Sequence, residues 1–439
     1  MSAQAEYEDR KVLIHLLNSG EKPRTAAQQI GRSIPWAYKW KARYEQDGWE
    51  GLRSRSRAPR RVPRKIPAEI RQKILSIRSQ LEQEAETPDS LGYIGADAVY
   101  GRLRMEAVSP LPAVSTIERI LCQAGRTRPR LPQAEKAVIY PQLKPTAAHQ
   151  LTQVDIVPQY LTGGQRIDCF NSIDVVSRYP AGEQFASKRS ADAVAFLLHT
   201  WRELGCSEYL QMDNESCFNG GYKHPGVIGK VVRLALYVGV QPLFSPCYHP
   251  QSNAFVERIH LDYLNFVWKK VQLADLAAVH QRSALFFPNY RNSHHHSALA
   301  GKSPLEIHQA APLRKLPFDF SVPHPLPITA GQVHFMRAVD AEHSVRILNM
   351  DWSAGLGVPD QGVWATLLLK PPDRATLRIY DAAPDAAKRR CLAAHPFPLK
   401  VPVVPLQAQF ASKQNGRNWW QSLLFSFFKP PVLTPSTMS

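Results

Sequence analysis

Ser245-Pro-Cys-Tyr-His249-Pro-Gln-Ser-Asn253-Ala-Phe-Val-Glu257-Arg-Ile-His260 is the stretch that decides how the middle of the chain is interpreted. Its first half contains prolines and small polar residues and predicts a loop, whereas its second half predicts a helix that begins near Asn253. Glu257 falls in the first turn of this helix, where the positive end of the helix favours a carboxylate. The stretch therefore places one acidic side chain directly after a polar loop.

Two further acids have apolar flanks. Asp155 lies inside a strand predicted at 152–157, in Gln-Val-Asp-Ile-Val, and Asp213 closes a strand predicted at 208–212, in Gln-Met-Asp-Asn. A single aspartate in a strand is usually a turn residue or an ion-pair partner. Three carboxylates from distant positions could instead hold two Mg²⁺ or Mn²⁺ ions about 3.5–4 Å apart, as phosphodiester transfer requires. We therefore predict that Asp155, Asp213 and Glu257 are catalytic residues and metal ligands.

The composition indicates a polyanionic partner. The chain has 439 residues, a formal net charge of +17 and a pI near 9.7. Lys and Arg release counterions from phosphates, so DNA is the expected partner, with a merely soluble basic protein as the alternative. The six cysteines form no CxxC pair, which favours a reducing compartment over a disulfide framework or a zinc finger. The charged N-terminus and the lack of a long apolar run predict a cytoplasmic protein with no membrane partner.

The N-terminal region reads as a helix-turn-helix DNA-binding domain over residues 1–52. Helices are predicted at 7–18 and 25–30, with Thr25 available as a cap, and a third helix is capped by Ser33. The third helix would enter the major groove, and an ordinary three-helix bundle is the alternative. Residues 53–65 form a basic linker that either follows phosphates or is only solvated surface. The DNA-contacting residues predicted here are Lys39, Lys41, Arg43, Arg53, Arg55, Arg57, Arg60 and Arg61.

The rest of the chain divides into further predicted segments. Residues 66–126 predict a second helical DNA-binding domain, with a capping box at Ser115, and 127–148 a linker. Residues 149–310 alternate strands (152–157, 167–175, 179–185, 208–212, 240–244) and helices (190–204, 224–238, 253–270), which predicts a mixed α/β core. Short β-rich runs between 325 and 400 predict a small β-barrel. Residues 401–439 read as a tail.

These motifs resemble those of the DDE transposase and retroviral-integrase superfamily, in particular bacterial insertion-sequence transposases. The resemblance covers residues 150–305 and rests on the three acids with their flanks, on Ser172-Ile-Asp174-Val-Val-Ser-Arg178-Tyr179, on the 245–260 stretch, and on Tyr290–Leu299 with Lys302-Ser-Pro304. The fold it implies is RNase H-like. The implied multidomain protein has N-terminal all-α helix-turn-helix modules, an integrase catalytic core and a C-terminal small β-barrel.

The same resemblance implies the reaction and its partners. A mobile-element enzyme of this type would nick element ends and join the 3′-OH to target DNA in transposition, with Asp155, Asp213 and Glu257 holding two magnesium or manganese ions. His249, Gln251 and Asn253 would lie beside DNA, and Arg258 or Lys269 would meet phosphate, with capping and solvated surface as alternatives. Self-association at synapsis and a bacterial, nucleoid-associated location are expected. The need for an accessory ATPase is left open.

Departures from the family pattern and competing interpretations remain. Asp213 and Glu257 are separated by a longer segment than is usual, assigned to an insertion at 220–230, and Glu215 and Ala254 stand where glycine is common. His294-His295-His296 is not expected to bind a metal, and Asp174 is interpreted as structural. The N-terminal 148 residues contain only His15 and Cys122 as soft metal ligands, which excludes an N-terminal zinc site. Two alternatives stay open: a catalytically inactive DNA-binding protein, or a metal-dependent nuclease without strand transfer.

Overall fold

The computed structural model describes residues 3–54, 66–127, 138–220, 224–247, 249–293, 296–317 and 319–411, and these form two compact units, Met1–Pro67 and Ala68–Ser439. Arg55, Arg57, Arg60, Arg61, His294, His295 and the residues from 412 onward lie outside the described part. No helix among the described residues is both long and apolar enough to cross a membrane.

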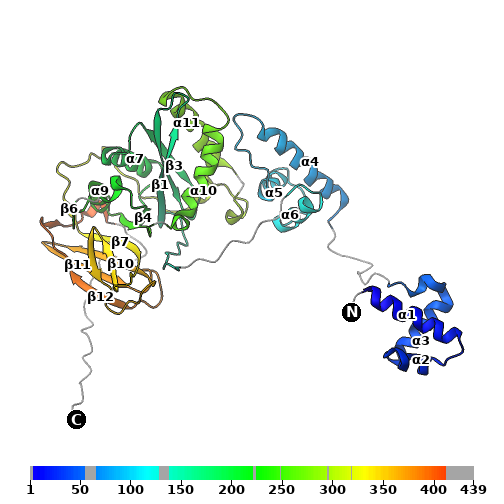
Figure 1. The fold of residues 1–439 in the computed structure, drawn as a ribbon. Helices are drawn as coiled ribbons and strands as arrows, with labels where there is room; N and C mark the ends of the chain where they lie inside the picture. The colour runs from blue at the N-terminus through cyan, green and yellow to red at the C-terminus, as the bar shows by residue number, and fades with distance from the viewer. Residues whose placement is uncertain are drawn as a thin grey trace, which may run out of the picture. The chain divides into compact units, whose positions relative to one another are not determined.

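The first unit is a helix-turn-helix domain. It comprises α1 (Ala3–Asn18), α2 (Pro23–Ile30), α3 (Ile34–Asp47) and the 3-10 turn η1 (Gly48–Leu52) (Figure 1). Gly31 closes α2 with a φ of 73°, which favours glycine, and the hydroxyl of Ser33 accepts a hydrogen bond from Trp36 N at the start of α3. The predicted turn and the Ser33 cap are confirmed. The Thr25 cap is wrong, because α2 begins two residues earlier, at Pro23, whose fixed φ suits a first turn.

The second unit begins with three helices, α4 (Ala68–Ala85), α5 (Ala96–Met105) and α6 (Val114–Gln123). The helical character predicted for residues 66–126 is confirmed. The predicted capping box is wrong, since Ala113 is the residue that precedes α6 and Ser115 already lies inside it. The loop after α4 contacts the following α/β region, where Lys270 Nζ donates hydrogen bonds to the carbonyls of Ala85, Thr87 and Ser90.

The α/β core has RNase H-like topology. β1 (Leu151–Tyr160), β2 (Arg166–Asp174) and β3 (Pro180–Phe185) form an antiparallel meander, and β4 (Tyr209–Met212) and β5 (Gln241–Phe244) add in parallel beside β1. The strand order in this part is β5-β4-β1-β2-β3. All five predicted strands are confirmed, and the central core is the mixed α/β fold that the sequence indicates.

Helices cover both faces of this sheet (Figure 1). On one face α7 (Ser190–Glu203) and α9 (Lys230–Tyr237) pack over Val154 and Phe170; on the other, α10 (Ala254–Tyr263) and α11 (Leu276–Asn292) pack over Cys169. Adjacent residues of a strand point to opposite faces, so Val154 and Asp155 must face different helix layers. Asp155 therefore shares the face of Val157, which packs with the α10 and α11 cluster.

Short elements complete the core and lead out of it. They are α8 (Ser216–Asn219), η2 (Pro250–Asn253), the π-helical turn η3 (Leu264–Trp268), η4 (Ser297–Leu299) and α12 (Pro304–Gln309). The predicted helix at 224–238 is shorter than expected, because the residues before Lys230 form a loop. Gly220 ends α8 with a φ of 97°, and a Cβ at this residue would lie 2.8 Å from the Cα of Gly229, so only glycine fits at this turn.

The C-terminal region is strand-rich, as predicted. Its strands are β6 (Ile328–Thr329), β7 (Gly331–Ala338), β8 (Ser344–Ile347), β9 (Met350–Ser353), β10 (Gly362–Lys370), β11 (Arg374–Tyr380), β12 (Cys391–Pro396) and β13 (Val403–Val404), followed by η5 (Ala408–Phe410). Strands β6, β9, β12 and β13 were not predicted, and β9 and β12 are the longer two of these. Both alternate buried or half-buried residues with exposed ones, a weak signal over so few residues.

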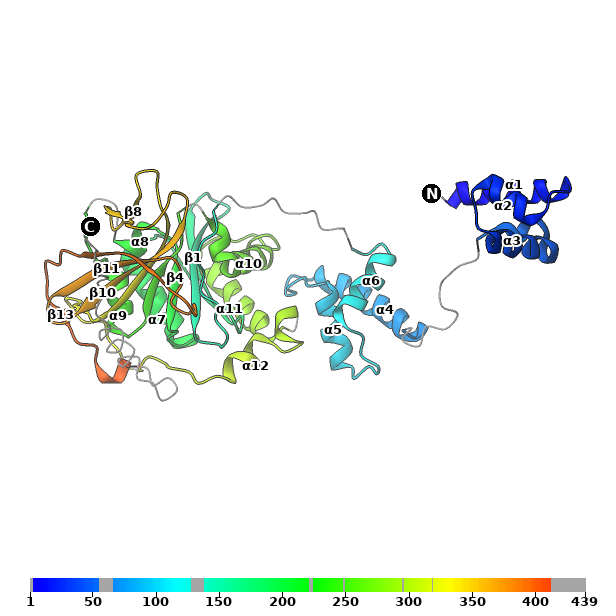
Figure 2. The ribbon, with the colours of Figure 1, turned by 90° about the horizontal axis from the view of Figure 1, so that it is seen from below.

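The C-terminal strands were predicted to form a separate β-barrel, but they pair with the core sheet. β7 pairs in parallel with β5, so one nine-stranded sheet runs β12-β11-β10-β7-β5-β4-β1-β2-β3 through core and C-terminal region (Figure 2). Among the described residues the ladder does not close on itself. The physical reason is the outer edge of β5, whose unpaired backbone groups need a partner that β7 supplies. The hydrophobic core is correspondingly shared, with Phe244 of β5 stacked on Phe335 of β7.

Candidate active site

Asp155 and Asp213 are brought side by side by the pairing of β1 with β4. The parallel register matches Gln153 with Gln211, and each aspartate lies two residues further along its strand direction. Because successive residues rise equally along both strands, the two carboxylates stand at the same level, at the carboxyl end of β4. Two acids that are 58 positions apart in sequence therefore become neighbours through one backbone ladder.

The side chain of Gln153 fixes the start of α10 against β1. Its Oε1 accepts from Phe255 N at 3.2 Å and Val256 N at 3.4 Å, and its Nε2 donates to the carbonyl of Ser252 at 2.9 Å. These bonds satisfy backbone groups that a helix N-terminus leaves unpaired. Glu257 follows in the first turn of α10, so the third acid is tied to the strand that carries Asp155.

Gln211 does the same for the loop before α10. Its Nε2 lies 3.0 Å from Ser245 Oγ, 2.8 Å from Ser252 O and 3.0 Å from Asn253 Oδ1. Ser245 Oγ also donates to Asn253 Oδ1, at 2.7 Å. Asn253 is buried and its side chain takes part in this network, so the residue shapes the loop from inside, and its contact with DNA stays a prediction.

Burial raises the proton affinity of all three carboxylates, and neighbouring acids raise that of Asp155 further. Burial, then the charge of Asp213, and to a smaller extent those of Glu257 and Glu215, raise the pKa of Asp155 to about 7. Burial raises the pKa of Asp213 to about 6, with Glu215 adding to the shift, and burial also raises the pKa of Glu257. Perturbed carboxyl pKa values of this kind are typical of functional sites and of sites that await a cation.

Glu215 adds a fourth negative charge at the edge of the site and is paired with Lys188. The ammonium of Lys188 lies 3.0 Å from both carboxylate oxygens of Glu215. Glu215 and Ala254 stand where glycine is common in the family. Neither residue strains the backbone, because Glu215 has a φ of −56° and Ala254 a φ of −55°. Both residues therefore sit where any L-amino acid is comfortable.

The C-terminal strands support the same edge from outside. Arg337 of β7 donates to Asn214 Oδ1 at 2.7 Å and to the carbonyl of Ser245 at 3.0 Å. Asn214 Nδ2 in turn donates to Ser245 O, so the residue after Asp213 is held between β5 and β7. Sequence reasoning missed Arg337, since nothing in its neighbourhood indicates that β7 pairs with β5.

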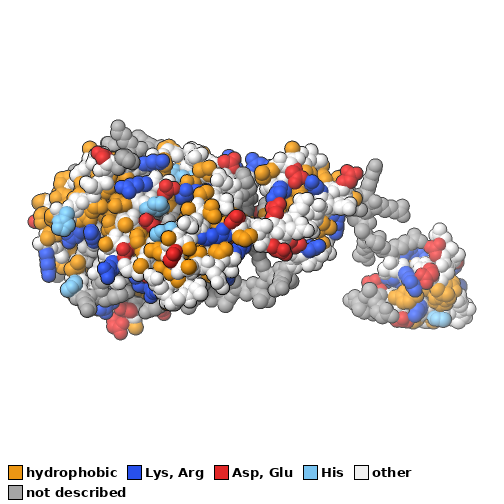
Figure 3. Space-filling model, turned by 90° about the horizontal axis from the view of Figure 1, so that it is seen from above, with side chains coloured by type: hydrophobic (Ala, Val, Ile, Leu, Met, Phe, Trp, Pro, Cys, Tyr) orange, Lys and Arg blue, Asp and Glu red, His pale blue; other side chains and the backbone are white. Residues whose placement is uncertain are grey.

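The predicted DNA-contacting residues fall into different settings. Lys39 is exposed, Lys41 lies 3.5 Å from Glu45, Arg43 stacks over Trp40, and Arg53 pairs with Glu50. On the second unit, Gln251 and Arg258 are exposed, and His249 Nδ1 lies 2.9 Å from Ser252 Oγ. Figure 3 shows basic side chains spread among acidic and apolar ones over one face of the molecule. Contacts of these residues with DNA stay a prediction.

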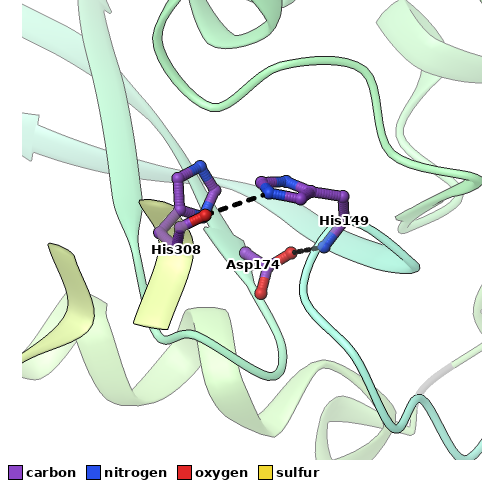
Figure 4. Close-up of side chains that lie close together, drawn as sticks. All are labelled: His149, Asp174 and His308. Atoms are coloured by element: carbon purple, nitrogen blue, oxygen red, sulfur yellow. Dashed lines mark hydrogen bonds between the residues drawn. The ribbon is translucent and has the colours of Figure 1, made fainter. Parts of the chain in front are cut away.

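A second cluster of potential ligands is buried elsewhere, at His149, Asp174 and His308, whose ligand atoms lie within 4.8 Å of one another (Figure 4). Asp174 accepts from the backbone of His149, Val176 and Ser177. His308 uses both ring nitrogens, with Ser177 Oγ and Leu204 O, and His149 Nε2 is bonded to His308 O. A carbonyl partner requires an N–H, which leaves no lone pair for a metal at those nitrogens.

This second cluster is therefore a hydrogen-bonded connection. It ties the segment before β1 to the end of β2 and to α12. The structural interpretation of Asp174 is supported by its backbone hydrogen bonds. The aromatic neighbours of His308 complete the packing, with Tyr179 stacked on its ring at 4.1 Å.

Family models match the N-terminal helical part of the chain. Models of homeodomain-like helix-turn-helix domains match residues 5–53 and 36–121. No curated protein matches the chain by sequence. The DNA-binding fold predicted for the N-terminal region is thus confirmed as a helix-turn-helix type.

Similar solved structures are retroviral integrases of low identity. The magnesium-bound catalytic core of HTLV-2 integrase is 14% identical, with 38% of this chain and 99% of that chain covered and a TM-score of 0.30. Simian T-cell lymphotropic virus integrase in an intasome with a PP2A regulatory subunit is 15% identical (75% and 99% covered, TM-score 0.32). The BIV integrase core is 18% identical (37% and 95% covered, TM-score 0.28). The strand order and the helix-turn-helix matches, independently of these likenesses, agree with the resemblance to the DDE superfamily.

Proposed function

We propose that the protein is a DDE-type DNA transposase or integrase that nicks the ends of a mobile element and joins each 3′-OH to target DNA. The observation that carries the proposal is the approach of Asp155, Asp213 and Glu257, from two strands and one helix, into a site where their charges interact. Helix-turn-helix domains at the N-terminus supply the means to bind double-stranded DNA. The reaction class follows from the acids and the DNA-binding domains together.

The donor set fits divalent cations. All three side chains offer hard carboxylate oxygens, which Mg²⁺ and Mn²⁺ accept. Burial raises the pKa of all three carboxyls, and the charge of Asp213 raises that of Asp155 further, so the charged carboxylates are disfavoured and a cation would stabilise them. Asp155, Asp213 and Glu257 would therefore hold two ions. Bound ions would lower the pKa of an attacking water or 3′-OH and stabilise the leaving oxygen.

The protein's own contribution is placement. Asp155 and Asp213 lie on or directly after paired strands, and Gln153 and Gln211 hold the loop and helix that carry Glu257, so the three carboxylates have little freedom to move apart. The side chain of Asp155 is 21% exposed, which leaves the site open to a phosphate from solvent. The exposed Gln251 and Arg258 flank Glu257 and would meet the DNA backbone on the way in.

Two protomers are needed at synapsis, because two element ends must be joined together while each protomer holds one acidic site. The alternatives make different predictions. A catalytically inactive DNA-binding protein has no use for half-buried acids of raised pKa at Asp155 and Asp213, which cost folding free energy when charged. A nuclease without strand transfer would nick the end but leave the 3′-OH unjoined.

The test is a nicking and joining assay with the full chain, Mg²⁺ or Mn²⁺, and duplexes carrying the inverted repeats that flank its reading frame. Asp213→Asn should lower the rates of nicking and joining at least about 1000-fold while duplex binding is unchanged. Asp360→Asn is the matched control, since Asp360 is exposed in the C-terminal region and has a φ of 61°, which asparagine tolerates. Unchanged joining by Asp213→Asn would refute the proposal, and nicking without joining would favour the nuclease.

A further inference from the structure

His260 lies one turn after Glu257 on α10 and faces the same acidic site. Its Nδ1 is 3.7 Å from Asp155 Oδ2, and its side chain is only 12% exposed. Positions three apart on a helix share a face, so Glu257 and His260 point toward β1 together. His260 is the last residue of the 245–260 stretch, and no role was predicted for it.

The hydrogen-bonding needs of this ring are not met by the protein. Its Nε2 is buried and has no partner among the described residues, and 3.7 Å is too long for a hydrogen bond from Nδ1. A neutral imidazole carries a lone pair on one of its two nitrogens, which a metal ion can accept. If Nε2 carries the proton, the lone pair of Nδ1 faces a carboxylate oxygen.

Other buried histidines in the chain show what a satisfied ring looks like. His334 bonds Thr366 Oγ1 and Gln241 Oε1, each at 3.0 Å, and His308 bonds Ser177 and Leu204. In these two histidines both ring nitrogens are bonded within the protein. His260 differs from both, and it is the one of the three that approaches a candidate metal ligand.

A cation between Nδ1 and Oδ2 would give the Nδ1 lone pair and the Asp155 carboxylate oxygen a shared partner. Metal–nitrogen and metal–oxygen bonds of about 2.0–2.2 Å place neighbouring ligand atoms about 3.0–3.5 Å apart on one ion. The observed 3.7 Å needs a movement of only a few tenths of an ångström. A Glu-x-x-His pair on one helix face beside further carboxylates is an arrangement that holds iron and manganese ions in helical proteins.

We propose that His260 Nδ1 is a nitrogen ligand of the ion held by Asp155, so that this ion has mixed nitrogen and oxygen coordination. The inference rests on the proposed function and specifies which ion it uses. Mg²⁺ takes oxygen ligands almost only, whereas first-row transition ions accept imidazole. The site at Asp155 accordingly selects Mn²⁺ over Mg²⁺.

The experiment measures ion binding rather than turnover. Mn²⁺ is added to the full chain, pulsed electron paramagnetic resonance detects ¹⁴N coupled to the ion, and calorimetry gives the affinities for Mn²⁺ and Mg²⁺. The wild-type protein should show directly bound ¹⁴N. His260→Asn should lose that signal and bind Mn²⁺ about 10–100-fold more weakly, with Mg²⁺ affinity nearly unchanged.

Controls separate the possible failures. His280→Asn replaces an exposed helical histidine of the same unit and should keep both the signal and the affinity. His260→Gln, with thermal melting of each variant, guards against misfolding of His260→Asn. Two outcomes overturn the inference and leave the proposed function intact. One is a ¹⁴N signal that persists in His260→Asn, and the other is a wild-type protein that binds Mn²⁺ through Asp155 but shows no ¹⁴N signal. Mn²⁺ binding that is unchanged by Asp155→Asn overturns both the inference and the proposed function.

Discussion

Gln153 Nε2 donates a hydrogen bond to Gln211 Oε1 at 3.3 Å across β1 and β4, and each glutamine lies two residues before a candidate catalytic aspartate. The same two amides hold the loop at Ser252 and the first turn of α10. One buried pair of side chains thus connects the three elements that carry Asp155, Asp213 and Glu257. Charge placement in this site depends on a neutral network beneath it.

Gln211→Ala should therefore weaken catalysis more than its distance from DNA suggests. The truncation removes one buried hydrogen bond from each of Ser245, Ser252 and Asn253, which costs about 1–3 kcal/mol of stability. Loosening the loop before Glu257 should lower strand joining about 10–100-fold at saturating metal, because catalytic ligands must be held within fractions of an ångström. Gln159→Ala, on the outer half of β1, is the control for denaturation and joining assays. Equal effects of the two variants would contradict the role given to the network.

Asp155→Asn should stabilise the metal-free protein at high pH. The pKa of Asp155 in the folded protein, about 7, exceeds that of an unfolded aspartate, about 3.9, because of burial and the charge of Asp213. Between about pH 4 and pH 7 the folded protein therefore keeps a proton on Asp155 that the unfolded chain has released. The contribution of Asp155 to folding stability is fully present below about pH 4 and is lost as the pH rises to about 7. At pH 8 in EDTA the variant should be about 1–3 kcal/mol more stable than wild type, and at pH 4 about equal.

Denaturation by urea at both pH values checks this difference, with Asp360→Asn as the exposed control. A variant that is destabilised equally at pH 4 and pH 8 would show that the Asp155 carboxylate is not strained by its neighbours. The same pKa implies that metal binding at pH 6.5 releases protons. Calorimetry in buffers of different ionisation enthalpy should detect this release in the wild-type protein and find less of it in Asp155→Asn.

Asp174→Ala should destabilise the protein without altering its metal affinity. The substitution leaves the backbone N–H groups of His149, Val176 and Ser177 without their acceptor, at a cost of about 2–4 kcal/mol. Zn²⁺ and Mn²⁺ should shift the melting temperature of wild type and variant by the same amount, since the ring nitrogens of His308 are already bonded. A metal-dependent shift that disappears with Asp174 would instead identify a second metal site.

Removal of the C-terminal strands should prevent the core from folding on its own. A chain ending after Gln309 lacks β7, so the edge of β5 and the face of Phe244 that stacks on Phe335 become exposed. We expect this truncation to aggregate on expression. Removal of Met1–Pro67, the separate first unit, should leave the remainder soluble with an unchanged melting temperature. A soluble, cooperatively melting core without β7 would restore the expectation of an independent C-terminal domain.

The sequence by itself determined local structure and the candidate acids. Alternation of apolar residues located all five core strands, Gly31 and Ser33 located the helix-turn-helix, and the flanks of Asp155, Asp213 and Glu257 marked them as unusual. The repeated Gln-x-Asp at 153–155 and 211–213 was also visible, and it was the available signal for the amide pair. These features are local, because backbone propensity and capping act over a few residues.

Tertiary structure alone decided the rest. Parallel pairing of β1 with β4 sets the level of Asp155 against Asp213, and pairing of β5 with β7 joins the C-terminal strands to the core sheet. The burial of Asn253 in the supporting network and the approach of His260 to Asp155 are equally invisible in the sequence. Register and long-range contact depend on which edges and faces find partners, and residues far apart in the chain supply them.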